Sequence, residues 1–377
     1  MAIGSVRSAI DKLKEKYEFR HNLGNNKMEF RLIGEETFRD LTDFDFNSMK
    51  VMLELNGVSC SKENLRSIIF SDLWEQFDPY KEFLKNLPLW DGHDHIADLA
   101  ATVKTDDDEY WLWCFKKWLV GFVGSLADDE TVNQTAPILS GGQGAGKSSW
   151  FKSILPPELK KYMSSGFLQP RDKETLVQLS ELCLYIMDEV ENLKPRNIEA
   201  IKELITKSEI YLRRAYTTLS QKYIRRCSFC GTSNEVNILH DLTGNRRFLC
   251  QKILDVDYML SGIDLSQVYA QAYQLFRSGF QFWFDNEDQA KVEEHNKRFR
   301  AESVEEQLIS TYLEPCLDGE EGAKRLAAYE IQTYLYQMAP KVKLSPVTIG
   351  KVLSAKGYTQ KKSNTLKWIV RLKEPNA

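Results

Sequence analysis

The sequence predicts an α/β protein built around a mostly parallel sheet, with a small α+β domain before it and a basic domain after it. A glycine-rich loop at 141–148 joins an apolar run to a helical pattern, strand and helix patterns alternate from about 134 to 254, and Lys and Arg gather near the C-terminal end. A chain of 377 residues is long enough for two or three domains that each bury a core. We expect these domains at 1–95, 96–265 and 266–377.

Composition indicates an intracellular protein with a polyanionic partner. Seven cysteines without framework spacing favour a reducing compartment, and no stretch approaches the roughly 20 apolar residues of a membrane span. No apolar segment precedes the charged run at 12–16, so we expect no signal peptide, a cytoplasmic location and no membrane partner. Residues 341–377 carry nine Lys or Arg and one Glu, a charge of +8, which leaves −12 for the rest of the net −4. Such a basic end suits a nucleic acid, although a solvated charged face would look the same.

The N-terminal region predicts a small helical domain with one hairpin. Residues 18–20 and 28–33 alternate like strands around a turn, and helical periodicity follows at 46–55 and 62–74. A break at 87–92 marks a boundary. A further helix, rich in Trp and Phe, is expected at 108–124, with its acidic start suited to a helix N-terminus.

The glycine-rich loop has the complete pattern of a phosphate-binding loop. It consists of Gly141, Gly142, Gln143, Gly144, Ala145, Gly146, Lys147 and Ser148, followed by Ser149 at the start of a helix. Glycines let backbone N–H groups turn toward phosphate oxygens. Lys147 would neutralise the β- and γ-phosphates and Ser148 would hold Mg²⁺. A chance glycine-rich turn is disfavoured because a strand precedes the loop and a helix follows it. We expect a nucleoside triphosphate to bind here.

Two polar strand ends extend this predicted site. The apolar run 182–187 ends in Asp188 and Glu189, and a strand at 227–233 leads to Asn234. The carboxyl ends of parallel strands share one edge of a sheet. Asp188 would then face Mg²⁺, Glu189 would polarise the attacking water, and Asn234 would orient that water or sense the γ-phosphate. Each motif alone would be an ordinary strand end or a turn.

Two groups of basic residues are candidates for phosphate contacts. A Thr-Gly-Asn turn presents Arg246 and Arg247, either of which, with Arg246 slightly favoured, could reach the γ-phosphate on a neighbouring subunit; solvated arginines on a surface turn are the alternative. Between 204 and 226, basic and aromatic residues interleave, as suits a segment that follows a single strand, although a solvated hairpin is nearly as good an account. The candidate DNA contacts are Arg213, Arg214 and Lys222, with Lys361 and Lys362 in the basic tail.

Three other patterns resemble sites but favour structural roles. The His- and Asp-rich segment 91–95 resembles a metal cluster, but it precedes a helical pattern at 96–99 and suits helix capping better. Cys227 and Cys230 lie on a strand, where alternation places them on opposite faces, and no partner pair exists for a zinc site. The acids in 43–45 indicate the entry of a helix rather than a polymerase site.

Taken in order, these motifs resemble those of the virulence-associated protein E family, phage- and island-borne ATPases related to superfamily 3 helicases. The resemblance rests on the segments 87–92, 141–148, 187–189, 231–234 and 243–248. The last two are the most specific, because a generic phosphate-loop protein would have no reason to carry both. Family members often carry a primase-like domain ahead of this region, and we expect this chain to lack one.

The resemblance implies an AAA+-like P-loop NTPase core that assembles as a hexameric ring around single-stranded DNA. ATP and Mg²⁺ would bind between subunits, with Arg246 or Arg247 completing the neighbour's site. The basic tail, helical at 346–353 and strand-like at 366–370, looks like a winged helix. Duplex DNA at an origin and a primase are candidate further partners. We expect a replicative helicase; the alternatives are an ATP-assembled initiator or interference factor and, much less favoured, a small-molecule phosphotransferase, which would be complete as a monomer.

Overall fold

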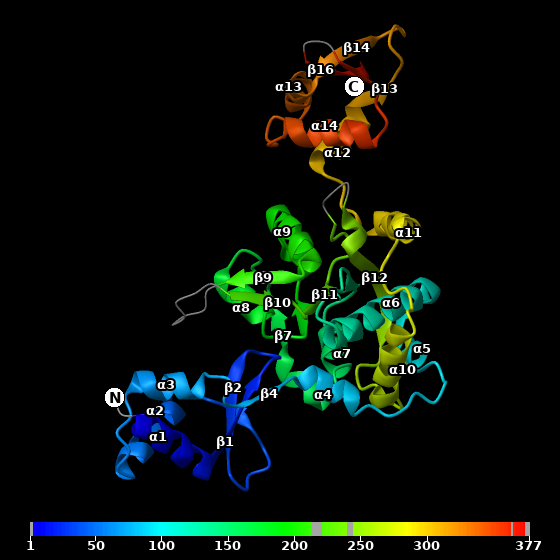
Figure 1. Ribbon diagram of the computed structural model, residues 1–377. Helices are drawn as coiled ribbons and strands as arrows, with labels where there is room; N and C mark the ends of the chain where they lie inside the picture. Colours follow the sequence, from blue (N-terminus) through cyan, green and yellow to red (C-terminus); the bar gives the residue numbers. More distant parts are fainter. Residues whose placement is uncertain (1–2, 213–220, 240–243, 363–364, 374–377) are drawn as a thin grey trace.

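The chain folds into three bodies that follow one another along the sequence (Figure 1). The computed structural model describes residues 3–212, 221–239, 244–362 and 365–373. Separate clusters of buried apolar side chains lie in the N-terminal body, on the two faces of the central sheet, and in the C-terminal body. No helix within these ranges is both long and apolar enough to cross a lipid bilayer.

The N-terminal body packs helices against a small sheet with strand order β3-β2-β1-β4. Its elements are α1 (Ile3–Lys16), β1 (Tyr17–Asn22), β2 (Lys27–Leu32), β3 (Arg39–Asp40), α2 (Asp43–Leu55), α3 (Lys62–Ile69) and β4 (Glu75–Phe77). The expected hairpin is confirmed, since Tyr17 pairs with Leu32 in an antiparallel ladder. Thr42 and Asp45 form a capping box at the start of α2, which confirms the helix entry at 43–45.

One expected helix in this body is shorter than its periodicity indicated. The pattern at 62–74 becomes helical only to Ile69. Trp74 instead folds back over the helix end, where its indole N–H donates to the Ile68 carbonyl at 2.9 Å. A buried ring can repeat a helical spacing without belonging to the helix, because burial alone creates the pattern.

The central body is built on a sheet with strand order β5-β12-β6-β11-β8-β7. The strands are β5 (Val103–Thr105), β6 (Ala136–Ser140), β7 (Met163–Gly166), β8 (Leu184–Met187), β11 (Ser228–Ser233) and β12 (Phe248–Val256). The ladders from β12 across to β7 are parallel, and β5 is antiparallel to β12. The expected mostly parallel α/β sheet is therefore confirmed. Strand β11 lies between β6 and β8, although it follows both in the sequence.

Helices cover both faces of this sheet. One face packs against α5 (His95–Ala101), α6 (Asp108–Ala127), α7 (Lys147–Ser153) and α10 (Leu265–Arg277), and the other against α8 (Lys173–Leu179) and α9 (Pro195–Thr206). The remaining elements of the central body are α4 (Pro79–Lys85), a hairpin of β9 (Glu209–Leu212) and β10 (Gln221–Ile224), α11 (Asn286–Asn296), and the short 3₁₀ helices η1 (Pro157–Tyr162), η2 (Val190–Asn192), η3 (Asn245–Arg247) and η4 (Lys297–Phe299). Cys227 packs with the α8–α9 face and Cys230 with the other, so the two thiols do lie on opposite faces.

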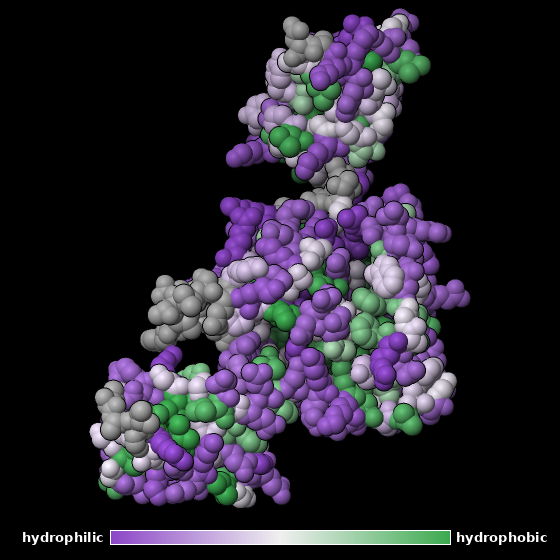
Figure 2. Space-filling view, viewed as in Figure 1, coloured by the Kyte–Doolittle hydropathy of each residue, from purple (hydrophilic) through white to green (hydrophobic). Residues whose placement is uncertain are grey.

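The C-terminal body has the order helix, strand, strand, helix, helix, strand, strand around its own core. Its elements are α12 (Val304–Tyr312), β13 (Leu313–Pro315), β14 (Ala323–Ala327), α13 (Ala328–Met338), α14 (Pro346–Ala355), β15 (Gln360–Lys362) and β16 (Leu366–Leu372). Strand β16 pairs with β13, β14 and β15, each antiparallel. The face of this body seen in Figure 2 is largely hydrophilic, with separate apolar side chains.

Candidate active site

The glycine-rich loop follows β6. Its middle is unobstructed, and its first and last glycines lie against neighbouring side chains. Gly144 and Gly146 have φ values of +78° and +84°, which favour glycine. A Cβ at Gly142 or Gly144 would meet no atom within 4 Å, whereas one at Gly141 would lie 2.5 Å from Ile253 Cγ1 and one at Gly146 2.7 Å from Tyr258 Cδ1. The middle of the loop therefore has room for a ligand, while both ends press against side chains of β12 and the segment after it.

Lys147 places its ammonium group across the mouth of this loop. Nζ donates to the carbonyl oxygens of Gly141 and Gly142, both at 2.7 Å, and to Asn234 Oδ1 at 3.3 Å. The residue is only 6% exposed, and burial lowers the pKa of its amine, against the opposing effect of the Glu191 charge. Among the described residues no carboxylate lies within ion-pair distance of Nζ. A buried cation without a counter-ion suits an anionic ligand.

Hydroxyl groups from two elements converge on the carboxylate of Asp188. Ser148 Oγ donates to Asp188 Oδ1 at 2.8 Å, and Thr232 Oγ1 donates to the same oxygen at 3.3 Å. A hard divalent cation such as Mg²⁺ takes oxygen ligands of this kind, so the residues present fit the expected metal. Thr232 lies within the motif 231–234, but its place in the sequence predicts no role for its hydroxyl. Its hydroxyl belongs to the cluster because β11 lies between β6 and β8.

Two further acids follow Asp188, and the structure separates their environments. Glu189 is exposed, has an unusual φ of +53°, and accepts a hydrogen bond from Asn192 Nδ2 at 2.9 Å. Glu191 accepts the backbone N–H of Asn234 at 3.0 Å through Oε1, and its other oxygen is buried with no hydrogen-bond partner among the described residues. Glu191 was not among the residues predicted for the site, although three acids within 188–191 are a visible signal.

Arg246 and Arg247 lie at the opposite edge of the sheet from this cluster. They form η3 immediately before β12, and Phe248 of β12 pairs in parallel with Ala136 at the start of β6. The phosphate loop begins only after the five residues of β6, so about 16 Å of strand separates the arginines from it. That separation exceeds the reach of an arginine side chain, so neither arginine acts on the loop of its own chain.

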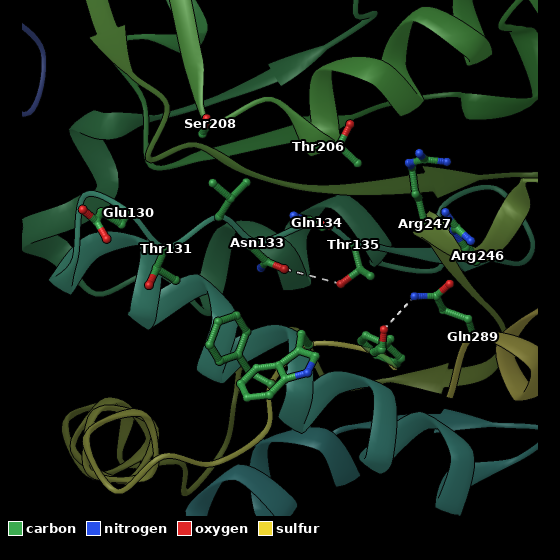
Figure 3. Close-up of a pocket in the computed structure, with 14 residues that line it drawn as sticks. Glu130, Thr131, Asn133, Gln134, Thr135, Thr206, Ser208, Arg246, Arg247 and Gln289 are labelled. Atoms are coloured by element: carbon green, nitrogen blue, oxygen red, sulfur yellow. Dashed lines mark hydrogen bonds between the residues drawn. The ribbon is translucent and has the colours of Figure 1, made fainter. Parts of the chain in front are cut away.

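A cavity of about 650 Å³ opens beside the two arginines (Figure 3). Its polar wall comes from Asn133, Gln134, Thr135, Thr206, Ser208 and Gln289, and its apolar wall from Phe282, Trp283 and Phe284. Arg246 is exposed, whereas Arg247 is half-buried with its Nε unpartnered among the described residues. Burial lowers the pKa of Arg247, and the charge of Arg246 lowers it further. Two adjacent guanidinium groups that repel each other are suited to receive an anion.

The expected DNA contacts are spread over separate elements. Arg213 and Arg214 lie outside the described residues. Lys222, on β10, is exposed and forms an ion pair with Glu209 at 2.6 Å, which raises the pKa of Lys222. Lys361 pairs with Asp318 at 2.6 Å, and Lys362 beside it is exposed. The structure does not bring these lysines into the phosphate-loop cluster.

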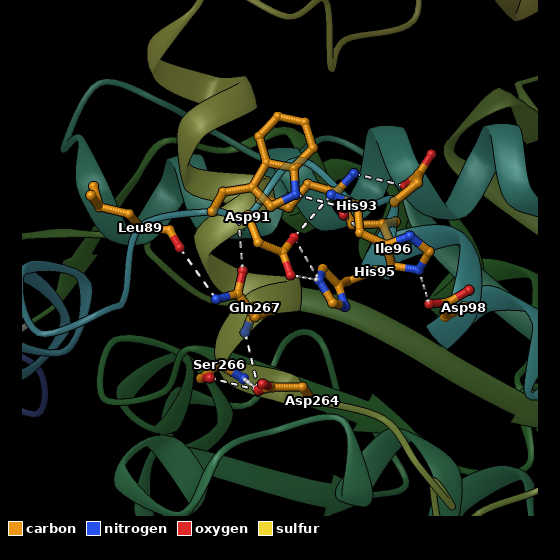
Figure 4. A network of polar contacts seen from close by, with 12 residues as sticks. Leu89, Asp91, His93, His95, Ile96, Asp98, Asp264, Ser266 and Gln267 are labelled. Carbon is orange, nitrogen blue, oxygen red and sulfur yellow. Dashed lines mark hydrogen bonds and ion pairs between the residues drawn. The ribbon is translucent and has the colours of Figure 1, made fainter.

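The His- and Asp-rich segment forms a polar network at the start of α5 (Figure 4). Asp94 accepts the backbone N–H of Ala97 at 3.2 Å, which confirms the capping interpretation for this residue. His93 Nε2 lies 2.6 Å from Asp98 Oδ2 and His95 Nε2 lies 2.9 Å from Asp91 Oδ1. Ligand-type atoms of His93, His95 and Asp98 lie within 4.8 Å of one another, but these hydrogen bonds already account for the arrangement.

Comparisons with known proteins give a family match and solved structures of similar fold. A family model described as the virulence-associated protein E-like domain matches residues 84–301, more than half of the chain. No curated protein matches. Among solved structures, the apo structure of the NrS-1 C terminal region (305-718) has a TM-score of 0.51 at 14% identity, covering 99% of this chain and 100% of that one. The A form apo structure of the same region has a TM-score of 0.50 at 14% identity, covering 98% and 99%. At this identity the likeness is one of fold.

Proposed function

The chain belongs to the virulence-associated protein E-like family, and we propose that it is a replication-associated ATPase of a phage or mobile element that acts as a DNA helicase. In this proposal it forms a ring, in the favoured case a hexamer, that translocates on single-stranded DNA in the host cytoplasm. The observation that carries the proposal is the placement of the phosphate loop and the arginine pair at opposite edges of one sheet. A complete site then needs two subunits.

The first half of the site would bind the triphosphate. The open loop at 142–145 would hold the phosphate chain, and Lys147 would turn from the loop carbonyls toward the β- and γ-phosphates. Ser148 and Asp188, with Thr232 behind them, would hold Mg²⁺, which supplies neutralisation of charge on the phosphate oxygens.

The acids and Asn234 would prepare the attacking water. Glu189, exposed at the strand end, would accept a proton from that water. Glu191 fixes the backbone of Asn234, so that its side-chain amide stays beside Lys147 and the γ-phosphate position. Since β11 lies between β6 and β8, Asn234 stands between the loop and the acids, which supports an AAA+-like core.

The second half of the site would come from the next subunit. A head-to-tail contact places the amino edge of one sheet against the carboxyl edge of another, and repetition of this contact closes a ring when the rotation permits. Arg246, which is exposed, would reach the γ-phosphate of the neighbour, and Arg247 would support it from the cavity wall. Such an arginine stabilises charge in the transition state and raises the rate of hydrolysis by large factors.

DNA would contact two other regions. The hairpin of β9 and β10 carries Lys222 and the segment with Arg213 and Arg214, and it would face the single strand. The order of helices and strands in the C-terminal body supports a winged helix, in which β15 with Lys361 and Lys362 would contact duplex DNA at an origin. A primase is a further candidate partner.

ATP hydrolysis measured with and without single-stranded DNA tests this proposal, with unwinding of a forked duplex as the second readout. We expect strong stimulation by single strands, strand separation, and loss of both with Lys147→Ala. Hydrolysis that is indifferent to DNA would contradict a motor. Combined with specific duplex binding through the C-terminal body, it would favour the initiator or interference role.

A further inference from the structure

The order of strands in the sheet determines the direction in which the nucleoside part of a bound nucleotide would extend from the phosphate loop. The terminal phosphate must lie near Lys147, Asp188 and Asn234, because these groups carry the charge and the polar contacts. Asp188 follows β8 and Asn234 follows β11, and both strands lie on the same side of β6. The other neighbour of β6 is β12. The nucleoside end therefore extends toward the end of β12.

The segment after β12 presents an aromatic ring at this position. Tyr258 packs so closely on Gly146 that a Cβ there would lie 2.7 Å from Tyr258 Cδ1, yet the tyrosine is 46% exposed. Met259, the next residue, is 75% exposed. A ring that touches the last glycine of a phosphate loop and remains half open to solvent is placed beside the ligand rather than within the core.

Hydrogen bonds hold this segment in a fixed shape. The carboxylate of Asp257 accepts the backbone N–H groups of Met259 and Ser261, both at 3.1 Å. The N–H of Asp257 donates to the Thr102 carbonyl at 2.8 Å, and Leu260 anchors the segment in the core with a φ of +55°. The ring of Tyr258 is thus presented by a rigid turn, which reduces the entropy lost when a ligand stacks on it.

We propose that Tyr258 is the platform on which the nucleobase of the bound triphosphate stacks, with Met259 flanking it. The inference rests on the proposed function only in requiring a triphosphate at the loop. Stacking on an aromatic ring is tolerant of base identity, since every base has a π-face. The Asp257 carboxylate already accepts hydrogen bonds from two backbone amides, so it does not hydrogen-bond to the edge of the base. The subsite therefore selects a nucleoside over bare phosphate and discriminates weakly among bases.

Calorimetric binding of ATP and of inorganic tripolyphosphate to the full chain tests the platform. Tyr258→Ala should weaken ATP binding by roughly tenfold to a hundredfold and leave tripolyphosphate binding unchanged, whereas Tyr258→Phe should retain both. Unchanged ATP binding by Tyr258→Ala would overturn the proposal. Equal loss of both ligands would overturn it too, because the ring would then act only by packing against the loop.

Lys147→Ala separates this inference from the proposed function. That variant should lose both ligands; if it binds tripolyphosphate like the unaltered chain, the nucleotide site itself is wrong. A panel of ATP, GTP, CTP and UTP tests the weak discrimination directly. We expect affinities within about tenfold of one another, with purines ahead because they stack over a larger area. A hundredfold preference for one base would overturn recognition by stacking.

Discussion

At the scale of single residues, the Asp188 carboxylate accepts hydrogen bonds from Ser148 at the start of α7 and from Thr232 near the end of β11. Thr232→Val keeps the volume of the side chain and removes the hydroxyl that donates to Asp188 at 3.3 Å. Because a ligand that loses its supporting hydrogen bond is oriented less firmly, we expect the Mg²⁺ concentration for half-maximal hydrolysis to rise by about tenfold. Thr333→Val on α13, where the hydroxyl donates to a helix carbonyl, is the matched control. An unchanged Mg²⁺ dependence would contradict this role of Thr232.

Protonation of His93 makes the stability of the fold depend on pH. The hydrogen bond to Asp98, aided by the charges of Asp98, Asp91 and Asp94, raises the pKa of His93 above its ordinary value. The protonated ring therefore stabilises the fold below the unfolded-state pKa, and this contribution is lost as the pH rises through the folded-state pKa. Asp98→Asn should lower the His93 pKa in an NMR titration. It should also destabilise the protein more at pH 5.5 than at pH 8.5; an equal effect at both values would contradict the account.

At the scale of elements, the contact between the phosphate loop and the segment after β12 fixes the shape of the site. Gly146→Ala would place a Cβ 2.7 Å from Tyr258 at a residue with φ +84°, so we expect a loss of about 1–2 kcal/mol or more in the free energy of unfolding. Gly142→Ala adds a Cβ that meets nothing within 4 Å and should leave stability unchanged. Denaturant unfolding of both variants checks this. Equal stability of the two variants would contradict close packing between Gly146 and Tyr258.

Elements with local signals could be predicted from the sequence. The hairpin of β1 and β2, the phosphate loop, the strand before Asp188 and the cap by Asp94 each depend on residues close together in the chain. The position of β11 between β6 and β8 has no local signal, because chain order does not determine strand order in a parallel sheet. For the same reason the sequence could not indicate that Thr232 contacts Asp188, or that Tyr258 contacts Gly146.

At the scale of the whole molecule, the two edges of the central sheet have complementary chemistry. One edge carries an open anion cradle with acids beside it, and the other carries Arg246 and Arg247 in a cavity. The length of β6 keeps these parts of one chain about 16 Å apart. In the proposed ring, each head-to-tail contact between unlike edges would create one complete site. Activity should therefore depend on assembly.

Hydrolysis by a mixture of two inactive variants tests this sharing of sites most directly. We expect Lys147→Ala to be inactive and the hydrolysis rate of Arg246→Ala to fall by about a thousandfold, since in the proposed site this arginine would stabilise charge in the transition state. When the two are mixed equally and allowed to exchange subunits, one site in four pairs an intact loop with an intact arginine, so hydrolysis should recover to about a quarter of the unaltered level. A mixture no more active than the average of its parents would contradict a site shared between subunits.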